Sequence, residues 1–255
     1  MARDVFFLDH RNAEESGGDD SASKTNTYEA KMIKDLVLYF LKQGKYTKTG
    51  DVVVLCAYLG QLAKVRKLLS SEVATVIDER DAVQLINRGD EDEAADILAD
   101  STEQVNVSKR VLLRTVDNFQ GEEGTIVILS LVRNSGDTPM SKRKIGFLRS
   151  TNRANVALSR AREGLYILGN ADDLLASGSK MWSGVIEQLR QNEQIGPAFP
   201  AIPMIRSIEP FVVLAHASSS AVEVIRVARP VRLPVVFVNI LPTTDSLAAT
   251  WARCD

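Results

Sequence analysis

The sequence predicts an α/β protein with a mostly parallel, doubly wound sheet, followed by an irregular C-terminal tail. Strand and helix signals alternate up to about Asn192, and such alternation is typical of a parallel sheet covered by helices on both faces. The segment Asp51–Tyr58 is apolar on both faces, which indicates a strand buried inside such a sheet. Two polar stretches lie directly beside apolar strands or helices, where α/β proteins bind their ligands.

The first half of the chain supplies two strands and two helices around the buried segment. Val5–Leu8 is a short apolar strand, and a polar loop from Arg11 to Thr25 follows it. Asn26 can cap the next helix, and Glu29 completes a capping-box pattern. A second helix, Gln61–Leu69, packs back against the buried strand. The first helix carries an apolar stripe of Ala30, Ile33, Leu36, Val37, Phe40 and Leu41.

The second half repeats the alternation with β-branched and apolar runs. Strands are expected at Val111–Val116, Thr125–Val132 and Leu165–Gly169. Helices are expected at Thr151–Ala161, Asp172–Leu175 and Met181–Leu189. The last of these places Trp182, Val185, Ile186 and Leu189 on one face.

Composition places the chain among folded proteins of the reducing, intracellular environment. A length of 255 residues fits one sizeable α/β domain or two small ones, and 45% hydrophobic and 25% charged residues are ordinary proportions. The net charge of −2 excludes a generally basic surface but permits a local cationic groove. Two cysteines supply neither a disulfide framework nor a zinc set, and no apolar run reaches the ~18 residues of a membrane span.

Two segments depart from the alternation and set the expected domain limits. Residues 72–110 are rich in acidic groups, including Asp90–Glu93, and predict a solvated insertion within a domain at 1–195. From residue 196 to 255, prolines interrupt every apolar run, which disfavours regular structure. Two interpretations of this tail stay open: a disordered or small separate unit, and an artefact of the gene model.

The first of the two polar stretches is Thr115–Glu123, on the connection that follows an expected strand. Gly121 allows a tight turn or a close approach to a ligand. Gln120 can orient an attacking water, and a glutamate can accept from a ribose hydroxyl. An ordinary polar turn that contains a glycine explains this segment equally well when it is taken alone.

The second stretch is Asn152–Arg162, near the end of an expected helix. Arg160 and Arg162 would project from that helix as planar, permanently charged forks, which match phosphate groups and can stabilise charge that develops on a γ-phosphoryl group. A solvated basic helix face with surface ion pairs is the simpler interpretation of this segment by itself.

Together the two stretches resemble superfamily 1 helicases of the nonsense-mediated-decay helicase type. Thr115–Glu123 resembles their motif V, Asn155–Arg162 their motif VI, and Ala57–Gln61 their motif IV, in the expected order. The chain is most similar to the zinc-finger-containing RNA helicases linked to RNA interference and heterochromatin. Segments shared with that group are Ile77–Asp81, Leu131–Ser135 and Ile145–Leu148. The resemblance covers residues 5–192 and implies a RecA-like domain of the P-loop NTPase type, the second (C-terminal) one of such an enzyme.

The resemblance implies roles for individual residues at the nucleotide. Arg160 would be the arginine finger that reaches the γ-phosphate, and Gln120 would share the catalytic work. Gln120, Gly121 and Glu123 would line the ATP side of the cleft, with Glu123 toward the ribose. Arg162 would support this ATP site.

The same resemblance implies a nucleic-acid path and a missing partner domain. Thr115 and Arg133 would lie near the phosphate backbone of a single strand of RNA or DNA. A Gly-x-x-x-x-Gly-Lys-Ser/Thr loop is absent, so a first RecA-like domain, in cis or in trans, would hold ATP and Mg²⁺. The chain by itself is therefore expected to be inactive. His10 is expected at the surface or in a loop, and no metal site is expected because only His216 and Cys254 lie beyond the helicase segment.

The expected setting is intracellular, with no membrane contact. The resemblance favours the nucleus over the cytoplasm and RNA-silencing proteins as further partners. Two alternatives to a catalytic role stay open. One is a noncatalytic, helicase-like interaction module that binds through the acidic insertion, and the other is an inactive fragment without Walker A and Walker B elements.

Overall fold

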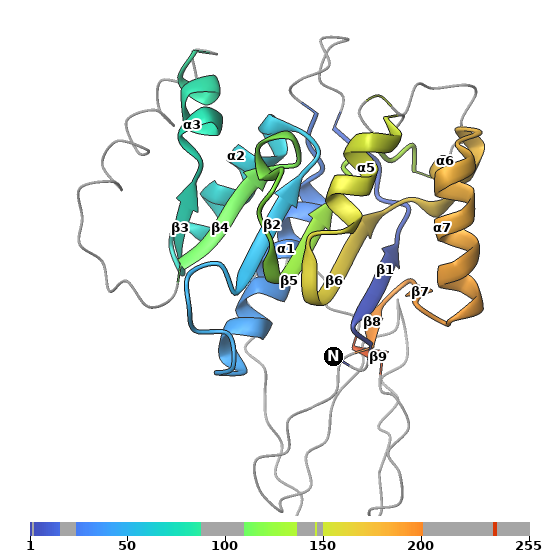
Figure 1. The fold of residues 1–255 in the computed structure, drawn as a ribbon, viewed down its shortest axis with the longest axis horizontal. Helices are drawn as coiled ribbons and strands as arrows, with labels where there is room; N and C mark the ends of the chain where they lie inside the picture. The colour runs from blue at the N-terminus through green and yellow to red at the C-terminus, as the bar shows by residue number, and fades with distance from the viewer. Residues whose placement is uncertain are drawn as a thin grey trace, which may run out of the picture.

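The computed structural model describes residues 1, 3–15, 24–87, 110–136, 146 and 150–200, and the backbone of 237–238. The described residues form a seven-stranded sheet in the order β3-β4-β2-β5-β6-β1-β7 (Figure 1), and every neighbouring pair in it is parallel. This confirms the predicted sheet. Its strands are β1 (Val5–Asp9), β2 (Val52–Cys56), β3 (Ala74–Ile77), β4 (Arg110–Thr115), β5 (Gly124–Ser130), β6 (Ala161–Gly169) and β7 (Ile195–Gly196).

Helices cover both faces of the sheet, as expected for a doubly wound fold (Figure 1). One face packs against α1 (Thr27–Lys42) and α2 (Leu59–Leu69), with α3 (Glu79–Ile86) beside α2. The other face packs against the 3-10 turn η1 (Asp117–Phe119), α5 (Thr151–Leu158), α6 (Ala171–Ala176) and α7 (Lys180–Gln191). None of the described helices combines the length and the apolar character that crossing a membrane demands.

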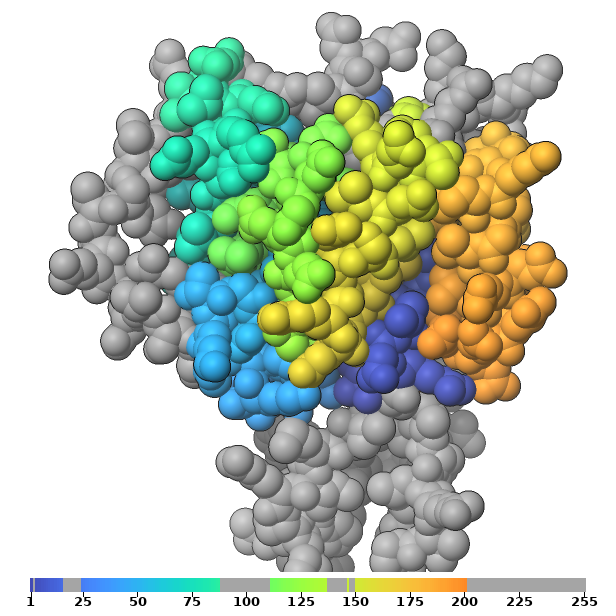
Figure 2. Space-filling view, in the orientation of Figure 1, coloured from blue at the N-terminus to red at the C-terminus, as the bar shows by residue number. Residues whose placement is uncertain are grey.

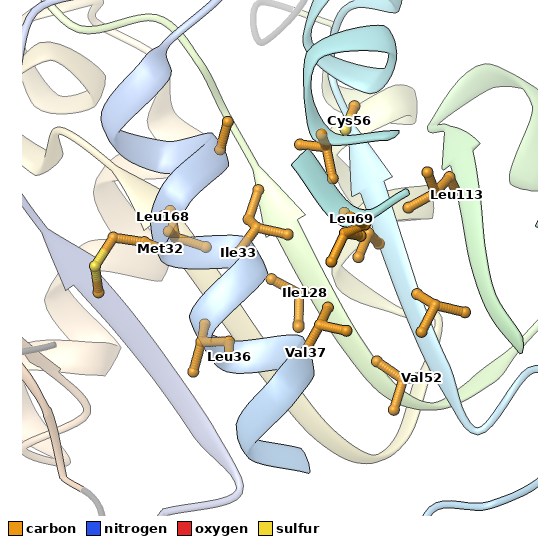
Figure 3. Packing of buried hydrophobic residues seen from close by; sticks show 14 of the residues in the cluster. Met32, Ile33, Leu36, Val37, Val52, Cys56, Leu69, Leu113, Ile128 and Leu168 are labelled. Atoms are coloured by element: carbon orange, nitrogen blue, oxygen red, sulfur yellow. The ribbon is translucent and has the colours of Figure 1, made fainter. Parts of the chain in front are cut away.

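Strand β2 shows why the core has two halves. Val52, Val54 and Cys56 point to the α1 side, where they pack in the cluster shown in Figure 3. Val53 and Leu55 belong to the cluster on the α5 side. All five residues are buried, so the absence of a polar face in the sequence is explained by helices on both sides of the strand. Burial raises the pKa of the Cys56 thiol well above its ordinary value.

The start of α1 differs from the capping box that the sequence suggests. Asn26 caps the helix, and its side chain accepts from the Glu29 N–H at 3.1 Å. The Glu29 carboxylate does not accept a hydrogen bond from the Asn26 N–H. This N–H donates instead to Gln61 Oε1 at 2.8 Å. The prediction is therefore right for Asn26 and wrong for Glu29. Because Glu29 is fully buried, its carboxylate bonds to donors in the core.

The first part of the predicted acidic insertion is part of the sheet. Ala74–Ile77 forms the edge strand β3, which pairs in parallel with β4, and Glu79–Ile86 forms α3, capped by Asp78. Leu85 is buried in the core on the α1 side. These residues therefore have regular structure, with Asp81 and Leu85 of α3 buried and its other side chains at least partly exposed. Asp90–Glu93 lies outside the described residues.

The domain also extends past the predicted limit at residue 195. Strand β7 pairs with β1, and Phe199 is 1% exposed with its ring centroid 5.6 Å from that of Phe6. The domain therefore includes at least β8 (Phe199–Pro200), which pairs with β9 (Phe237–Val238) in an antiparallel manner. The rest of the predicted tail lies outside the described residues.

Candidate nucleotide and nucleic-acid sites

The connection from β4 to β5 crosses the sheet on its α5 side. We call residues 116–123 the nucleotide-facing loop, after the role that the sequence resemblance implies for them. Phe119 anchors this loop in the core and is fully buried. Gln120, Gly121 and Glu123 are exposed. Gly121 has a φ of +89°, and a Cβ there would meet nothing within 4 Å. This backbone conformation therefore requires glycine at position 121. The exposed side chains of Gln120 and Glu123 are open to a ligand.

Arg160 lies between α5 and β6 and turns back toward the nucleotide-facing loop. Its Nη1 donates to the Glu122 carbonyl at 3.3 Å, and its Nε donates to the Val156 carbonyl at 3.1 Å. Nη2 donates to Ser159 Oγ at 2.9 Å. Within the described part of the chain, no carboxylate lies at ion-pair distance from this guanidinium. Among the described residues, the acceptors that hold this guanidinium are neutral.

The structure brings the two polar stretches together. The Gly124 N–H donates to the Arg160 carbonyl at 3.0 Å, and Asp117 pairs with Arg153 of α5 at 2.9 Å. In Figure 2 the green surface of the β4–β5 region adjoins the yellow surface of α5 and β6 in the middle of the face shown. Segments about forty residues apart in sequence thus form one surface.

Arg162 does not project from a helix beside Arg160. Strand β6 begins at Ala161, four residues before the predicted start, so Arg162 is a strand residue. Its Nη2 donates to Thr125 Oγ1 at 2.9 Å. Arg162 also lines a cavity of about 620 Å³ with Tyr39, Tyr46 and Tyr166. The prediction that both arginines share one helical platform is wrong, because the helix ends at Leu158.

Thr115, the last residue of β4, contacts a fully buried carboxylate of α3. Its N–H donates to Asp81 Oδ2 at 3.0 Å, and its hydroxyl donates to Asp81 Oδ1 at 2.7 Å. Asn118 Nδ2 donates to the same Oδ1 at 2.5 Å. Asp81 is 0% exposed. Because the hydroxyl hydrogen of Thr115 is committed to Asp81, only lone pairs of this oxygen face other groups.

Arg133 follows β5 through a strained turn. Val132 has a φ of +69°, and the Arg133 N–H donates to the Leu131 carbonyl at 2.7 Å. This is a γ-turn with positive φ, which is rare and costly for a β-branched residue. The Arg133 Nε donates to Glu14 at 2.6 Å. Burial acts to lower the pKa of this guanidinium, but Glu14 and Tyr58 raise it overall.

The predicted residues lie at two opposite ends of the sheet. Thr115 ends β4 and Arg133 follows the end of β5, so both lie at the carboxyl ends of the strands. Arg160 immediately precedes β6, whose first residue pairs with Gly124, the first residue of β5. The structure therefore brings Glu122 and Gly124 against Arg160 at the amino ends, and it places Thr115 and Arg133 apart from them.

A buried polar network stabilises the carboxyl ends of the central strands, and sequence reasoning missed it. Glu29 accepts from Ser130 Oγ at 2.5 Å and from the Val132 N–H at 3.0 Å. The Asn12 N–H donates to His10 Nδ1, so His10 Nε2 carries the hydrogen and donates to Glu29 at 3.2 Å. His10 follows β1 as a connecting residue, but it is only 6% exposed. The signal in the sequence was a set of polar residues after apolar runs.

Metal ligands are not gathered anywhere in the described ranges, where no group of three or more His, Cys, Asp or Glu could hold an ion. The nucleotide-facing loop instead exposes the Gln120 amide and the Glu123 carboxylate, and its Glu122 carbonyl accepts from the Arg160 guanidinium. Such groups can contact phosphate and ribose oxygens.

Comparisons with known proteins show which proteins the chain is similar to. A family model described as an AAA domain matches residues 1–172. The human NFX1-type zinc finger-containing protein 1 is 32% identical over 197 residues, which cover 77% of this chain and 8% of that protein. The Schizosaccharomyces pombe "Helicase required for RNAi-mediated heterochromatin assembly 1" is 33% identical over 191 residues, 74% of this chain and 15% of that protein.

A third relative is the "Regulator of nonsense transcripts 1 homolog" of Arabidopsis thaliana, which is 28% identical over 191 residues, 75% of this chain and 12% of that protein. The chain thus spans between 8% and 15% of the length of these three relatives. The family match, the parallel sheet and the two joined motifs lead to one conclusion. The chain belongs to the AAA-domain family, within the superfamily 1 helicases of the nonsense-mediated-decay type.

Proposed function

We propose that the chain acts as the C-terminal half of an ATP-dependent RNA or DNA helicase and supplies Arg160 to a nucleotide held by a first RecA-like domain. One observation carries this proposal. The Arg160 guanidinium lies against the nucleotide-facing loop, and its bonds within the described residues go to neutral acceptors. A cation without a counter-ion at a surface is suited to receive an anion from another domain.

Each exposed group of this surface has a chemical role in the proposal. Arg160 stabilises the negative charge that develops on the γ-phosphoryl group. The Gln120 amide orients the attacking water, and the Glu123 carboxylate accepts from a ribose hydroxyl. Mg²⁺, held by the first RecA-like domain, would neutralise charge on the β- and γ-phosphates. Arg162, which bonds to Thr125, supports the strand on which this surface is built.

The nucleic-acid path belongs, in this proposal, to the carboxyl ends of the strands near Thr115 and Arg133. It carries the phosphate backbone of a single strand and reads no bases. Closing and opening of the cleft at the amino ends would then move the single strand. The name of the Schizosaccharomyces pombe relative, a helicase required for RNAi-mediated heterochromatin assembly, supports RNA as the nucleic acid and a nuclear role in silencing.

The proposal is tested by mixing the purified chain with a first RecA-like domain taken from a relative. We expect no ATP hydrolysis from either part alone and hydrolysis stimulated by single-stranded RNA in the mixture. Nucleic-acid-stimulated hydrolysis by the chain alone would contradict the half-site argument. A mixture that binds but never hydrolyses ATP would favour a noncatalytic interaction module instead.

A further inference from the structure

Asp81 is a buried carboxylate for which the proposed reaction has no use. It is 0% exposed, and both its oxygens accept hydrogen bonds from the segment that begins the nucleotide-facing loop. The donors are the Thr115 N–H, the Thr115 hydroxyl and Asn118 Nδ2. Burying a carboxylate costs free energy unless such bonds replace its water. The arrangement therefore couples α3 strongly to the end of β4 and to η1.

The neighbours of Asp81 strengthen the same junction. Asp81 lies in the first turn of α3, where the helix dipole favours a negative charge. Arg80 bonds to the Asp78 carboxylate, and its Nη2 donates to the Asn118 carbonyl at 3.0 Å. Two consecutive residues of α3 thus hold the side chain and the carbonyl of Asn118. Two side chains of α3 therefore hold the η1 turn in place.

The nucleotide-facing loop is held at both of its ends. At the carboxyl ends of the strands, Asp81 fixes Thr115 and Asn118. At the amino ends, the Glu122 carbonyl accepts from Arg160, and the Gly124 N–H donates to the Arg160 carbonyl. Gln120 and Gly121 lie between these two anchors. A change at the Asp81 end is therefore expected to alter the position of Gln120 and the contacts at the Arg160 end.

We propose that Asp81 is a positioning residue that acts through Thr115 and Asn118 to set the place of Gln120 and Arg160 in the nucleotide site. This inference rests on the proposed function for its effect on hydrolysis. The Thr115 hydroxyl then serves Asp81 and donates to no phosphate, because its one hydrogen is already used. Helix α3, at the edge of the sheet, then helps to position the residues of the nucleotide site.

The first test uses the chain alone and follows amide hydrogen exchange in Asp81→Asn. Asparagine keeps the volume but presents an amide to hydrogen-bond donors. We expect exchange of both the Thr115 and the Gly124 amides to become about tenfold faster or more, the factor that matches loss of one hydrogen bond to a charged group. The matched control is Glu79→Gln, an exposed carboxylate in the same helical turn, which should change neither amide.

A purely local role for Asp81 predicts a different result. Exchange would then accelerate at Thr115 and stay unchanged at Gly124, and the proposal would be overturned. The Ile167 amide in the middle of β6 reports global unfolding. If Asp81→Asn also accelerates exchange of the Ile167 amide, the variant Asn118→Ala is used instead, because it removes a single hydrogen-bond donor to Asp81. Asn118→Ala should accelerate exchange of the Gly124 amide by a smaller factor. An unchanged exchange rate at Gly124 would again reject the proposal.

The second test measures hydrolysis in the mixture with a first RecA-like domain. Asp81→Asn should lower kcat about tenfold while the KM for ATP changes little, because Gln120 is misplaced and the phosphate-holding residues are intact. Thr115→Val removes the hydroxyl that donates to Asp81 and should match Asp81→Asn, whereas the control Glu79→Gln should retain the rate. An unchanged kcat in Asp81→Asn would contradict the inference. If the unaltered mixture does not hydrolyse ATP, the proposed function fails while the exchange result stands by itself.

Discussion

The Gly124 N–H donates to the Arg160 carbonyl at 3.0 Å, and this one bond aligns the starts of β5 and β6. It brings the end of the nucleotide-facing loop against the residue that follows α5. On its other side, the start of β5 packs closely against β2 because Gly124 has no side chain: a Cβ there would lie 2.6 Å from Val53 Cγ2. The glycine is therefore needed for packing, and its φ is not in the left-handed region.

Gly124→Ala is expected to destabilise the domain. The added methyl group would overlap Val53 in a fully packed core, and such overpacking costs about 1–3 kcal/mol. Urea unfolding followed by circular dichroism measures the loss. The control is Gly184→Ala on α7, where a Cβ would meet nothing within 4 Å. That change should be neutral or stabilise the domain by about 0.5–1 kcal/mol, since alanine is the better helix former. Equal effects of the two changes would refute the packing argument.

Much of the fold could be predicted from the sequence because it depends on periodicity. Asp51–Tyr58 and Thr125–Val132 are apolar on both faces, and both regions form central strands. Ala74–Ile77 could not be recognised as a strand, because an edge strand needs few apolar residues and acidic neighbours obscured it. Phe199 was likewise missed, since prolines in its vicinity indicated irregular structure.

Glu29→Gln is expected to lower the free energy of unfolding by about 1–3 kcal/mol, the cost of leaving a buried donor unsatisfied. The carboxylate accepts from His10, Ser130 and the Val132 N–H, and a glutamine amide can accept at one oxygen only. Glu187→Gln on the exposed side of α7 is the matched control and should leave the urea midpoint unchanged. A Glu29 variant as stable as the control would show that the network does not hold the γ-turn.

Glu15 is expected to titrate far below an ordinary glutamate. Hydrogen bonds from Lys64, Thr25 and Thr27 lower its pKa from 4.5 to about 2. Because the folded-state pKa is lowered, its contribution to stability is complete above pH 4.5 and is lost as the pH falls toward about 2.

Carbon-13 NMR of the Glu15 carboxyl group measures this pKa. Lys64→Ala should raise it toward 4.5, the ordinary value. Lys67→Ala, an exposed lysine on the same helix, should leave it near 2. A Glu15 pKa that is unaffected by either change would contradict the assigned contacts.

The candidate site was only partly accessible from sequence. The resemblance of two motifs assigned Gln120, Glu123 and Arg160 to one nucleotide site, and in the structure the two segments meet at Glu122 and Gly124. The separation of Arg160 from Arg162 was hidden, because it depends on where α5 ends and β6 begins. Asp81 was hidden as well, since its partner Thr115 lies 34 residues away along the chain.

In our proposal, Arg160 is delivered to a nucleotide held by another domain. The most direct measurement is the kcat for ATP of a mixture of the chain with a first RecA-like domain, using Arg160→Ala. We predict a fall of about 10³-fold or more, with the fold and the urea midpoint retained. Arg162→Ala should cost much less, and Arg190→Ala on α7 should cost nothing. Wild-type kcat in Arg160→Ala, or an equal fall in all three variants, would contradict the claim.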